Sequence, residues 1–304
     1  LTAGLYLARA RLETLVVEVG SAGGQMILSH QVANYPGAHD VSGAELSRTM
    51  LKQAREHGCE VLTQTRVEEL DLAASPKRFV LEDEGEVTAS AVILATGGTP
   101  RRLGLPSEEA FQGTGISYCA TCDGDFFADR EIVAIGGGNS ALEEAISLTR
   151  YASKVTVIHE FEEFQAQAWV VDEARRNPKI HFLMNQSVQG FEGGETLEAV
   201  VSRDKGTGAV TRTPAAGCFV FIGYIPNTEG IRDMVACNAR GEILADAEMA
   251  TSVPGVFAAG DARAKRTRQI TTATADGTVA ALSAIEFVAA QRSGHREAGV
   301  AAAS

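Results

Sequence analysis

The sequence has few cysteines, no long apolar run and a deficit of basic residues, and each shortage argues against a class of protein. Five cysteines in 304 residues are too few for a secreted disulfide scaffold, and the isolated Cys59, Cys218 and Cys237 predict a reducing, cytoplasmic compartment. No stretch approaches the roughly 20 consecutive apolar residues of a membrane-spanning helix, so we expect no membrane partner. The formal net charge of −12 argues against a nucleic-acid partner, which needs a basic surface.

What the sequence does have is a pair of closely spaced cysteines, Cys119 and Cys122, followed directly by Asp123. Two thiols at this spacing can close a small disulfide, and the adjacent acid can exchange the proton that dithiol chemistry releases. Half of a zinc site is an alternative, but such a site needs a second ligand pair, and the sequence has no second CxxC and no neighbouring Cys/His cluster. Two inert core thiols are the other alternative. The pattern favours a redox pair, and we predict no metal site.

Strands alternate with helices along the chain. Apolar runs predict strands over residues 15–18, 91–95, 131–135, 154–160 and 256–261, and helical spacing predicts helices over residues 1–10, 140–150 and 272–288. This alternation predicts an α/β fold with open, mostly parallel sheets whose sites lie at strand ends. Residues 195–220 instead predict antiparallel strands within the second unit.

Two nucleotide-binding units are predicted. The complete one has a strand over 131–135, a glycine turn at Gly136–Gly138, a helix, and a second strand ending at Glu160. The other, over residues 1–18, has only the helix and the strand ending in Glu18. Since such a unit spans ~30 residues, we expect roughly 15 more in front of residue 1. The expected fold is two Rossmann-like domains with doubly wound sheets.

Several ordered motifs resemble the low-molecular-weight, FAD-dependent thioredoxin reductases along essentially the whole chain. Such a series is more specific than any lone glycine fingerprint. The matching motifs are Gly23-Gly24-Gln25, Asn34-Tyr35-Pro36-Gly37, Ala95-Thr96-Gly97, the cysteine motif at 119–124, the glycine turn at 136–141, Gly260-Asp261 and Arg268-Gln269.

The resemblance implies an FAD domain formed by residues 1–112 and 245–304, an inserted pyridine-nucleotide-type domain at 113–244, and a homodimer. FAD would reduce the Cys119–Cys122 disulfide, which would reduce thioredoxin by thiol–disulfide exchange, with Asp123 as the general acid. One thiol would attack the partner and the other would face the flavin. The cofactor-binding residues that it implies are Glu18, Gly23, Gly24, Gln25, Asn34, Val67, Ala95, Thr96, Gly97, Gly260, Asp261, Arg268, Gln269 and Ile270.

The nucleotide half departs from the family pattern. NADPH-using members carry His-Arg-Arg-x-x-x-Arg after the second strand, whereas this chain has His159-Glu160-Phe161-Glu162-Glu163-Phe164-Gln165. Each lost charge-assisted contact is worth ~1.5–3 kcal/mol, so losing two or three weakens NADPH binding by a factor on the order of 10³. Pyridine nucleotide is therefore doubtful as a cofactor. The residual nucleotide site would comprise Gly136, Gly138, Asn139, Ser140 and Glu160.

Three electron donors stay open. The missing arginines resemble the ferredoxin-dependent flavin thioredoxin reductases, and transfer from ferredoxin at ~−400 mV to thioredoxin at ~−270 mV releases ~6 kcal/mol. A basic run of Arg263, Lys265, Arg266 and Arg268 could dock an acidic ferredoxin or hold FAD phosphates. NADH, with Glu160 on its ribose, ranks second, and weakly bound NADPH ranks third.

Two other functions fit the same residues. A dithiol oxidase related to this family would pass electrons from a small dithiol to oxygen. A flavin-binding redox sensor would signal through its disulfide without turnover. The intact CxxC-Asp motif favours the reductase over both.

Overall fold

The computed structural model describes residues 1–29, 31–39 and 41–302, and the side chains of these up to residue 293. The chain divides into two compact units. The first unit comprises residues 1–31, 35–99 and 225–304, and the second comprises residues 32–34 and 100–224. The inserted arrangement of Rossmann-like domains expected from the sequence is therefore the architecture found.

The boundaries differ from those predicted at 112/113 and 244/245. Residues 100–112 belong to the second unit because Leu103, Leu105 and Phe111 pack into its core. Residues 225–244 belong to the first unit because Ile231 and Val235, with neighbours such as Ile243, pack into the core of that unit. In both segments the packing of the apolar side chains decides the assignment.

The first unit is built on two pairs of parallel strands. Strand β1 (Leu15–Glu18) pairs with β2 (Glu60–Thr63), and β6 (Val92–Leu94) pairs with β17 (Val256–Ala258). An antiparallel sheet of β3 (Val67–Asp71), β4 (Lys77–Leu81) and β5 (Gly85–Ala89) completes its strands. Strands β7 (Gly98–Pro100) and β16 (Tyr224–Pro226) pair where the chain passes between the units.

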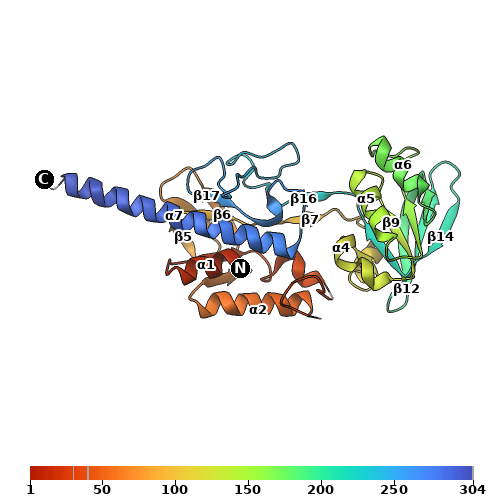
Figure 1. Cartoon of the computed structure of the whole chain (residues 1–304), viewed down its shortest axis with the longest axis horizontal. Helices are drawn as coiled ribbons and strands as arrows, with labels where there is room; N and C mark the ends of the chain where they lie inside the picture. Colours follow the sequence, from red (N-terminus) through yellow and green to blue (C-terminus); the bar gives the residue numbers. More distant parts are fainter. Residues whose placement is uncertain (30, 40, 303–304) are drawn as a thin grey trace. The chain divides into compact units, whose positions relative to one another are not determined.

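Three helices and two short 3₁₀ turns accompany these strands. Helices α1 (Thr2–Arg9) and α7 (Ile270–Ala302) lie side by side, with α2 (Gly43–Glu56) next to α1 (Figure 1). The 3₁₀ turns are η1 (Gly24–Leu28) and η3 (Gly260–Ala262). Helix α2 begins with a capping box, in which Ser42 and Glu45 each accept from the other's backbone N–H.

The pair β6–β17 is covered on both faces, as its alternating side chains require. Phe257 and Ile93 pack toward α7. Val256 and Ala258 face the other side, where they belong to a cluster that includes Leu70 of β3. Among the described residues, α7 over 270–293 is the one helix long and apolar enough to cross a membrane. Ala280, Ala281 and Ala284 of this helix are buried, and 33 % of its most apolar window is buried.

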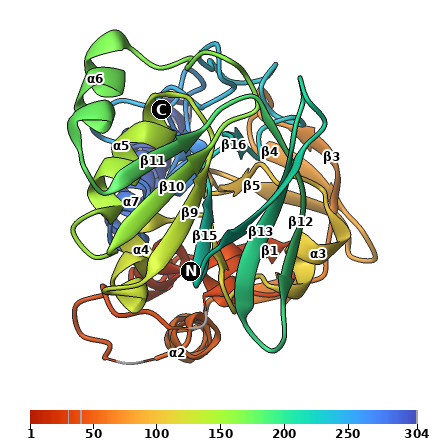
Figure 2. The same ribbon diagram turned by 90° about the vertical axis from the view of Figure 1, so that its right-hand side faces the viewer.

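The second unit has a five-stranded, wholly parallel sheet in the order β11-β10-β9-β15-β8 (Figure 2). The strands are β8 (Ile116–Ser117), β9 (Glu131–Ile135), β10 (Lys154–Ile158), β11 (Ile180–Leu183) and β15 (Gly217–Val220). Helices α5 (Asn139–Leu148) and α6 (Ala168–Arg176) cover one face of the sheet. Short helices α3 (Pro106–Ala110) and α4 (Ala120–Asp123) and the 3₁₀ turn η2 (Gly124–Phe127) complete the unit.

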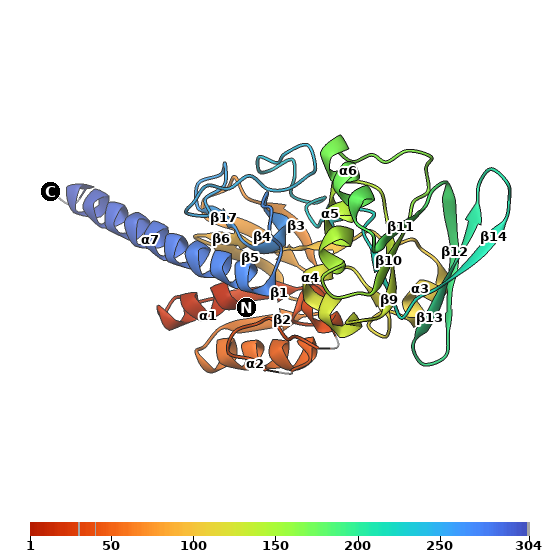
Figure 3. The ribbon, with the colours of Figure 1, turned by 45° about the vertical axis from the view of Figure 1, so that its right-hand side comes forward.

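An antiparallel sheet of β12 (Gln186–Gly193), β13 (Leu197–Asp204) and β14 (Val210–Pro214) covers the opposite face (Figure 3). Antiparallel strands were predicted for residues 195–220, and β13 and β14 fit that prediction. Strand β15 does not, because it pairs in parallel with β9 and β8. Its residues are all buried, which is typical of a central strand in a parallel sheet.

Candidate redox-active site

The two cysteines of the CxxC motif form a disulfide in the second unit. Cys119 precedes α4, Cys122 lies within it, and their Cα atoms are 5.3 Å apart. Gly124 follows α4 directly, and a Cβ at this position would press on Tyr151 and Leu148 at 3.0–3.1 Å. The glycine thus lets the cysteine motif lie close to the end of α5.

Asp123, the predicted general acid, is half-buried at the end of α4. Its Oδ2 accepts a hydrogen bond of 2.5 Å from the hydroxyl of Ser117, the buried last residue of β8. Burial raises the pKa of Asp123, the Ser117 hydrogen bond opposes that rise, and the charge of Asp125 adds to it. Burial dominates, so the carboxyl group holds a proton at higher pH than an exposed aspartate does.

A buried carboxylate holds the segment in front of the cysteines. Glu108 is 2 % exposed and accepts hydrogen bonds from Leu103 N at 3.1 Å, Gly104 N at 2.9 Å and the Tyr118 hydroxyl at 2.9 Å. Burial raises the pKa of Tyr118, and the hydrogen bond from its hydroxyl to Glu108 and the negative charge of Glu108 raise it further. The sequence did not single out Ser117, Glu108 or Tyr118, because none belongs to a periodic pattern or a spaced motif.

The predicted residual nucleotide site is assembled around the glycine turn between β9 and α5. Gly136 has φ +138°, and a side chain there would overlap the Phe221 carbonyl. The loop after β10 lies against this turn: Gln165 N donates to Gly137 O at 2.9 Å, and Gln167 N donates to Asn139 Oδ1 at 2.7 Å. The turn is therefore bonded to its own chain.

His159 connects the glycine turn to the loop that departs from the family pattern. Its ring stacks on Phe164 at 5.5 Å between centroids and covers Gly137 so closely that a Cβ there would overlap it. Its Nε2 lies 3.1 Å from the carbonyl of Glu163. Burial lowers the pKa of His159, although that hydrogen bond and Glu160 oppose the shift. The burial thus disfavours the charged imidazole, and the ring packs between Gly137 and Phe164.

The acidic side chains of this loop are exposed. Glu160, Glu162 and Glu163 all face solvent, where a nucleotide 2′-phosphate would meet their charge. Lys205, on the turn after β13, donates its Nζ to the Glu160 carbonyl at 3.1 Å and lies 5.2 Å from the centre of the Phe161 ring. This lysine was not foreseen from the sequence, since it is 45 residues from Glu160.

In the first unit, the structure brings two predicted cofactor segments together. Strands β6 and β17 are parallel, so Ala95-Thr96-Gly97 and Gly260-Asp261 leave the sheet at the same edge. Asn227 fixes the first of these segments, because its N donates to Gly97 O and its Nδ2 to Thr96 O, both at 3.0 Å. Asn227 was also missed from the sequence.

Asp276 of α7 holds the second segment. Gly260, with φ +74°, donates its N–H to Asp276 Oδ2 at 3.1 Å. The same carboxylate binds Arg263 at 3.0 Å and Lys265 at 2.8 Å, and Lys265 also lies 3.8 Å from Asp261. These contacts tie the start of α7 to the turn that follows β17.

These ion pairs correct one interpretation of the sequence. Arg263 and Lys265 are only 16 % and 11 % exposed, and both bind Asp276. Arg268 is 24 % exposed and binds Glu242. Of the four basic residues, only Arg266 is exposed, so the run is not the docking surface that its charge suggested.

The remaining predicted cofactor residues lie at turns and element ends. Glu18 ends β1 and accepts from Gly20 N at 2.8 Å. Val67 begins β3, Gln25 lies in η1, Gln269 and Ile270 lie at the start of α7, and Asn34 groups with the second unit. Gly23 has φ +122°, and Gly24 and Gly97 have φ +54° and +65° with no atom within 4 Å of the place that a Cβ would take.

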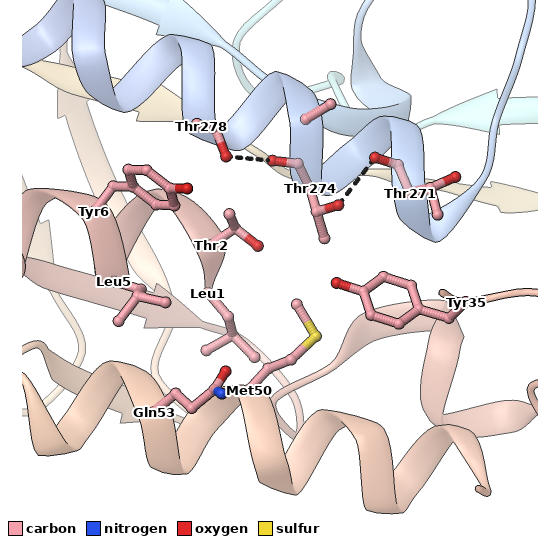
Figure 4. Close-up of a pocket in the computed structure, with 11 residues that line it drawn as sticks. Leu1, Thr2, Leu5, Tyr6, Tyr35, Met50, Gln53, Thr271, Thr274 and Thr278 are labelled. Atoms are coloured by element: carbon pink, nitrogen blue, oxygen red, sulfur yellow. Dashed lines mark hydrogen bonds between the residues drawn. The ribbon is translucent and has the colours of Figure 1, made fainter. Parts of the chain in front are cut away.

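A cavity of about 350 Å³ lies elsewhere in the first unit, between α1, α2 and α7 (Figure 4). Thr274 and Thr278 on its wall donate their hydroxyls to carbonyls of their own helix, at 2.9 and 3.1 Å. None of the predicted site residues lines this cavity. Among the residues that the structure describes, no group of three or more His, Cys, Asp or Glu could hold a metal ion.

Comparison with known proteins agrees with the chemistry of these residues. Residues 1–277 match the family model described as pyridine nucleotide-disulphide oxidoreductase. The chain is 41 % identical over 297 residues to a thioredoxin reductase of Peptoclostridium acidaminophilum, covering 95 % of this chain and 94 % of the relative. It is 41 % identical over 291 residues to a thioredoxin reductase of Listeria innocua, at 95 % and 90 % coverage.

A solved structure shows the same fold. The thioredoxin reductase of Streptococcus pyogenes superposes with a TM-score of 0.91 at 38 % identity, covering 95 % of this chain and 94 % of that one. At this identity the likeness extends to sequence as well as fold.

Proposed function

The chain belongs to the pyridine nucleotide-disulphide oxidoreductases and is an FAD-dependent disulfide oxidoreductase, and from this premise we propose that it reduces the disulfide of thioredoxin or a thioredoxin-like protein. The observation that carries the proposal is the Cys119–Cys122 disulfide with Asp123 directly after it. The relatives named thioredoxin reductase support the choice of substrate.

The partner's disulfide is reduced by thiol–disulfide exchange with the dithiol form of the enzyme. Reduced FAD would supply the two electrons that, with two protons, convert the Cys119–Cys122 disulfide to two thiols. A thiolate of the pair attacks one partner sulfur, which forms a mixed disulfide as the partner's S–S bond breaks. Asp123 protonates the departing thiolate. The second enzyme thiol then attacks the mixed disulfide, re-forms the Cys119–Cys122 bond and releases the partner as a dithiol.

The first unit has residues that fit FAD. Gly24 and Gly97 leave open backbone at positive φ, which lets a ligand approach closely. The carboxylate of Asp261 and the backbone of Gly260 lie at the carboxyl edge of the parallel strands, where nucleotides bind in such sheets. We propose that Asp261 binds the ribityl hydroxyls and that Glu18 binds the adenosine ribose, as an acid at this strand end does.

For the electron donor we propose a ferredoxin-type iron–sulfur protein before NADH, with NADPH third. The support is the loop after β10, where Glu160, Glu162 and Glu163 are exposed in place of phosphate-binding arginines. Each missing charge-assisted contact costs ~1.5–3 kcal/mol. Lys205 is a cation at the edge of this loop, but it already donates to the Glu160 carbonyl. Glu160 lies two residues after the end of β10, close to where an acid binds an unphosphorylated ribose in NAD sites, and this supports NADH as the second choice.

The test is an anaerobic titration of the FAD-loaded protein with NADPH, NADH and reduced ferredoxin in parallel. We expect the flavin absorbance to bleach with reduced ferredoxin, and oxidised thioredoxin added afterwards to be converted to dithiol. The control variant Cys119→Ser/Cys122→Ser should bleach equally and leave thioredoxin oxidised. Rapid bleaching by micromolar NADPH would refute the proposed donor. In a separate aerobic assay with a small dithiol and no other donor, hydrogen peroxide formed in step with dithiol consumption would refute the reductase.

A cytoplasmic location and a homodimer are part of the proposal. The support for the first is that Cys59, Cys218 and Cys237 are free thiols, as in a reducing compartment. The homodimer rests on the family resemblance alone.

A further inference from the structure

Ser117 joins the predicted general acid to the backbone of the first redox cysteine. The hydroxyl oxygen of Ser117 lies 2.5 Å from Asp123 Oδ2, 3.3 Å from Cys119 O and 3.1 Å from Cys119 N. Ser117 is 6 % exposed and ends β8 in the parallel sheet, opposite Phe219 of β15. The sheet therefore fixes the position of the hydroxyl group.

A serine hydroxyl has one proton and two lone pairs, which limits how these three contacts are made. The Cys119 N–H donates to one lone pair in every state. With Asp123 ionised, the single proton of Ser117 goes to the carboxylate, and 2.5 Å is a normal length for O–H···O⁻. With Asp123 protonated, the carboxyl group donates to the second lone pair, and the proton of Ser117 turns to Cys119 O. Each arrangement satisfies all the groups.

We propose that Ser117 is a positioning residue for Asp123. The Ser117 hydroxyl holds the Asp123 carboxyl group in place in both protonation states, because its one proton turns between Asp123 and Cys119 O. This inference rests on the proposed role of Asp123 as general acid. Its consequence is that the acid can lose its proton and regain it without changing place. Ser117 also stabilises the carboxylate that remains after the proton leaves.

The charges around Asp123 leave Ser117 as the group that favours ionisation. Burial raises the pKa of Asp123 and Asp125 of η2 raises it further, whereas the Ser117 hydrogen bond lowers it. Helix α5, which packs against α4, carries Glu143 and Glu144, and these are acids as well. The other residues of α4 do not titrate while the disulfide is closed.

The experiment is a pH titration of the Asp123 carboxyl carbon in oxidised, FAD-loaded protein labelled at aspartate with ¹³C. The signal is assigned as the one absent from Asp123→Asn. In Ser117→Ala we expect the midpoint to move up by about one to two pH units, the size that a hydrogen bond to a charged group gives. In Ser117→Thr, which keeps the hydroxyl, we expect the midpoint of the wild-type protein.

An unchanged midpoint in Ser117→Ala overturns the proposal, and so do equal shifts in the alanine and threonine variants, because shape alone would then explain them. If Ser117→Ala does not fold, Ser117→Cys decides: a midpoint above that of Ser117→Thr supports the proposal, and an equal midpoint overturns it. The titration needs no thioredoxin. The general-acid role is tested separately by thioredoxin reduction in Asp123→Asn, so the two failures are distinguishable.

Discussion

Replacing Asp276 with asparagine is expected to destabilise the first unit by about 3 kcal/mol, because two poorly exposed cations lose their shared carboxylate. Arg263 and Lys265 bind Asp276 at 3.0 and 2.8 Å, and the three side chains are 16 %, 11 % and 11 % exposed. Removing one partner of a fully buried ion pair costs about 3–5 kcal/mol, and the residual exposure favours the lower end. Asparagine keeps an oxygen for the Gly260 N–H, so the change is mainly one of charge.

The assay is hydrogen exchange of the α7 backbone, measured by mass spectrometry on peptides that contain Ala280, Ala281 and Ala284. These residues are at most 2 % exposed, so their slowest amides exchange through opening of the unit. A loss of about 3 kcal/mol lowers their protection by a factor on the order of 10².

The matched control is Glu86→Gln, which breaks the Arg78–Glu86 pair of the same unit. Those side chains are 50 % and 56 % exposed at 3.6 Å, and pairs of this kind are worth at most about 1 kcal/mol. Protection in the control should therefore fall less than about fivefold. If Asp276→Asn lowers protection no more than Glu86→Gln does, the reasoning about the buried carboxylate is wrong.

Three further predictions concern the second unit. Glu160→Arg with Phe161→Arg should tighten NADPH binding about 10²-fold or more, at ~1.5–3 kcal/mol per contact. NADH affinity in the same calorimetric titration should change less than tenfold. An unchanged NADPH affinity would show that the loop after β10 does not limit NADPH binding. Folding lowers the pKa of His159 below the value of about 6.5 that a histidine has in an unfolded chain. Below pH 6.5 the unfolded chain therefore binds more protons than the folded protein, so the stability should fall as the pH drops. His159→Phe should show a smaller Tm difference between pH 7 and 5. Gly137→Ala should cost about 1–3 kcal/mol in thermal unfolding, because its methyl overlaps His159, whereas Gly138→Ala, with nothing within 4 Å, should cost less; equal losses would contradict this.

The periodic features of the fold could be predicted from the sequence. Strands at Leu15–Glu18, Glu131–Ile135 and Lys154–Ile158 lie where apolar runs placed them, since burial on both faces of a parallel sheet requires such runs. The strand at Gly217–Val220 was assigned to the wrong sheet, because a four-residue apolar run does not specify its neighbours. The cysteine pair was also found, since its spacing is local.

The polar contacts that hold the candidate sites could not be predicted. Asp276 lies in an alanine-rich helix, where its charge suggests an exposed position, and yet it binds residues 11 and 13 positions away. Asn227 reaches Thr96 across 131 residues. Ser117 is one hydroxyl residue at a strand end. Contacts of this kind depend on tertiary distance, for which a single sequence has no periodic signal.

The glycine turn after β9 shows why a fingerprint alone is weak support for a bound nucleotide. Gly136 is required by the Phe221 carbonyl and Gly137 by the His159 ring, which a Cβ at either place would overlap. The turn also accepts a backbone hydrogen bond from Gln165. These requirements come from the packing of the chain itself and hold with or without a ligand. The turn can therefore stay intact whether or not a nucleotide binds beside the loop that carries glutamates in place of arginines.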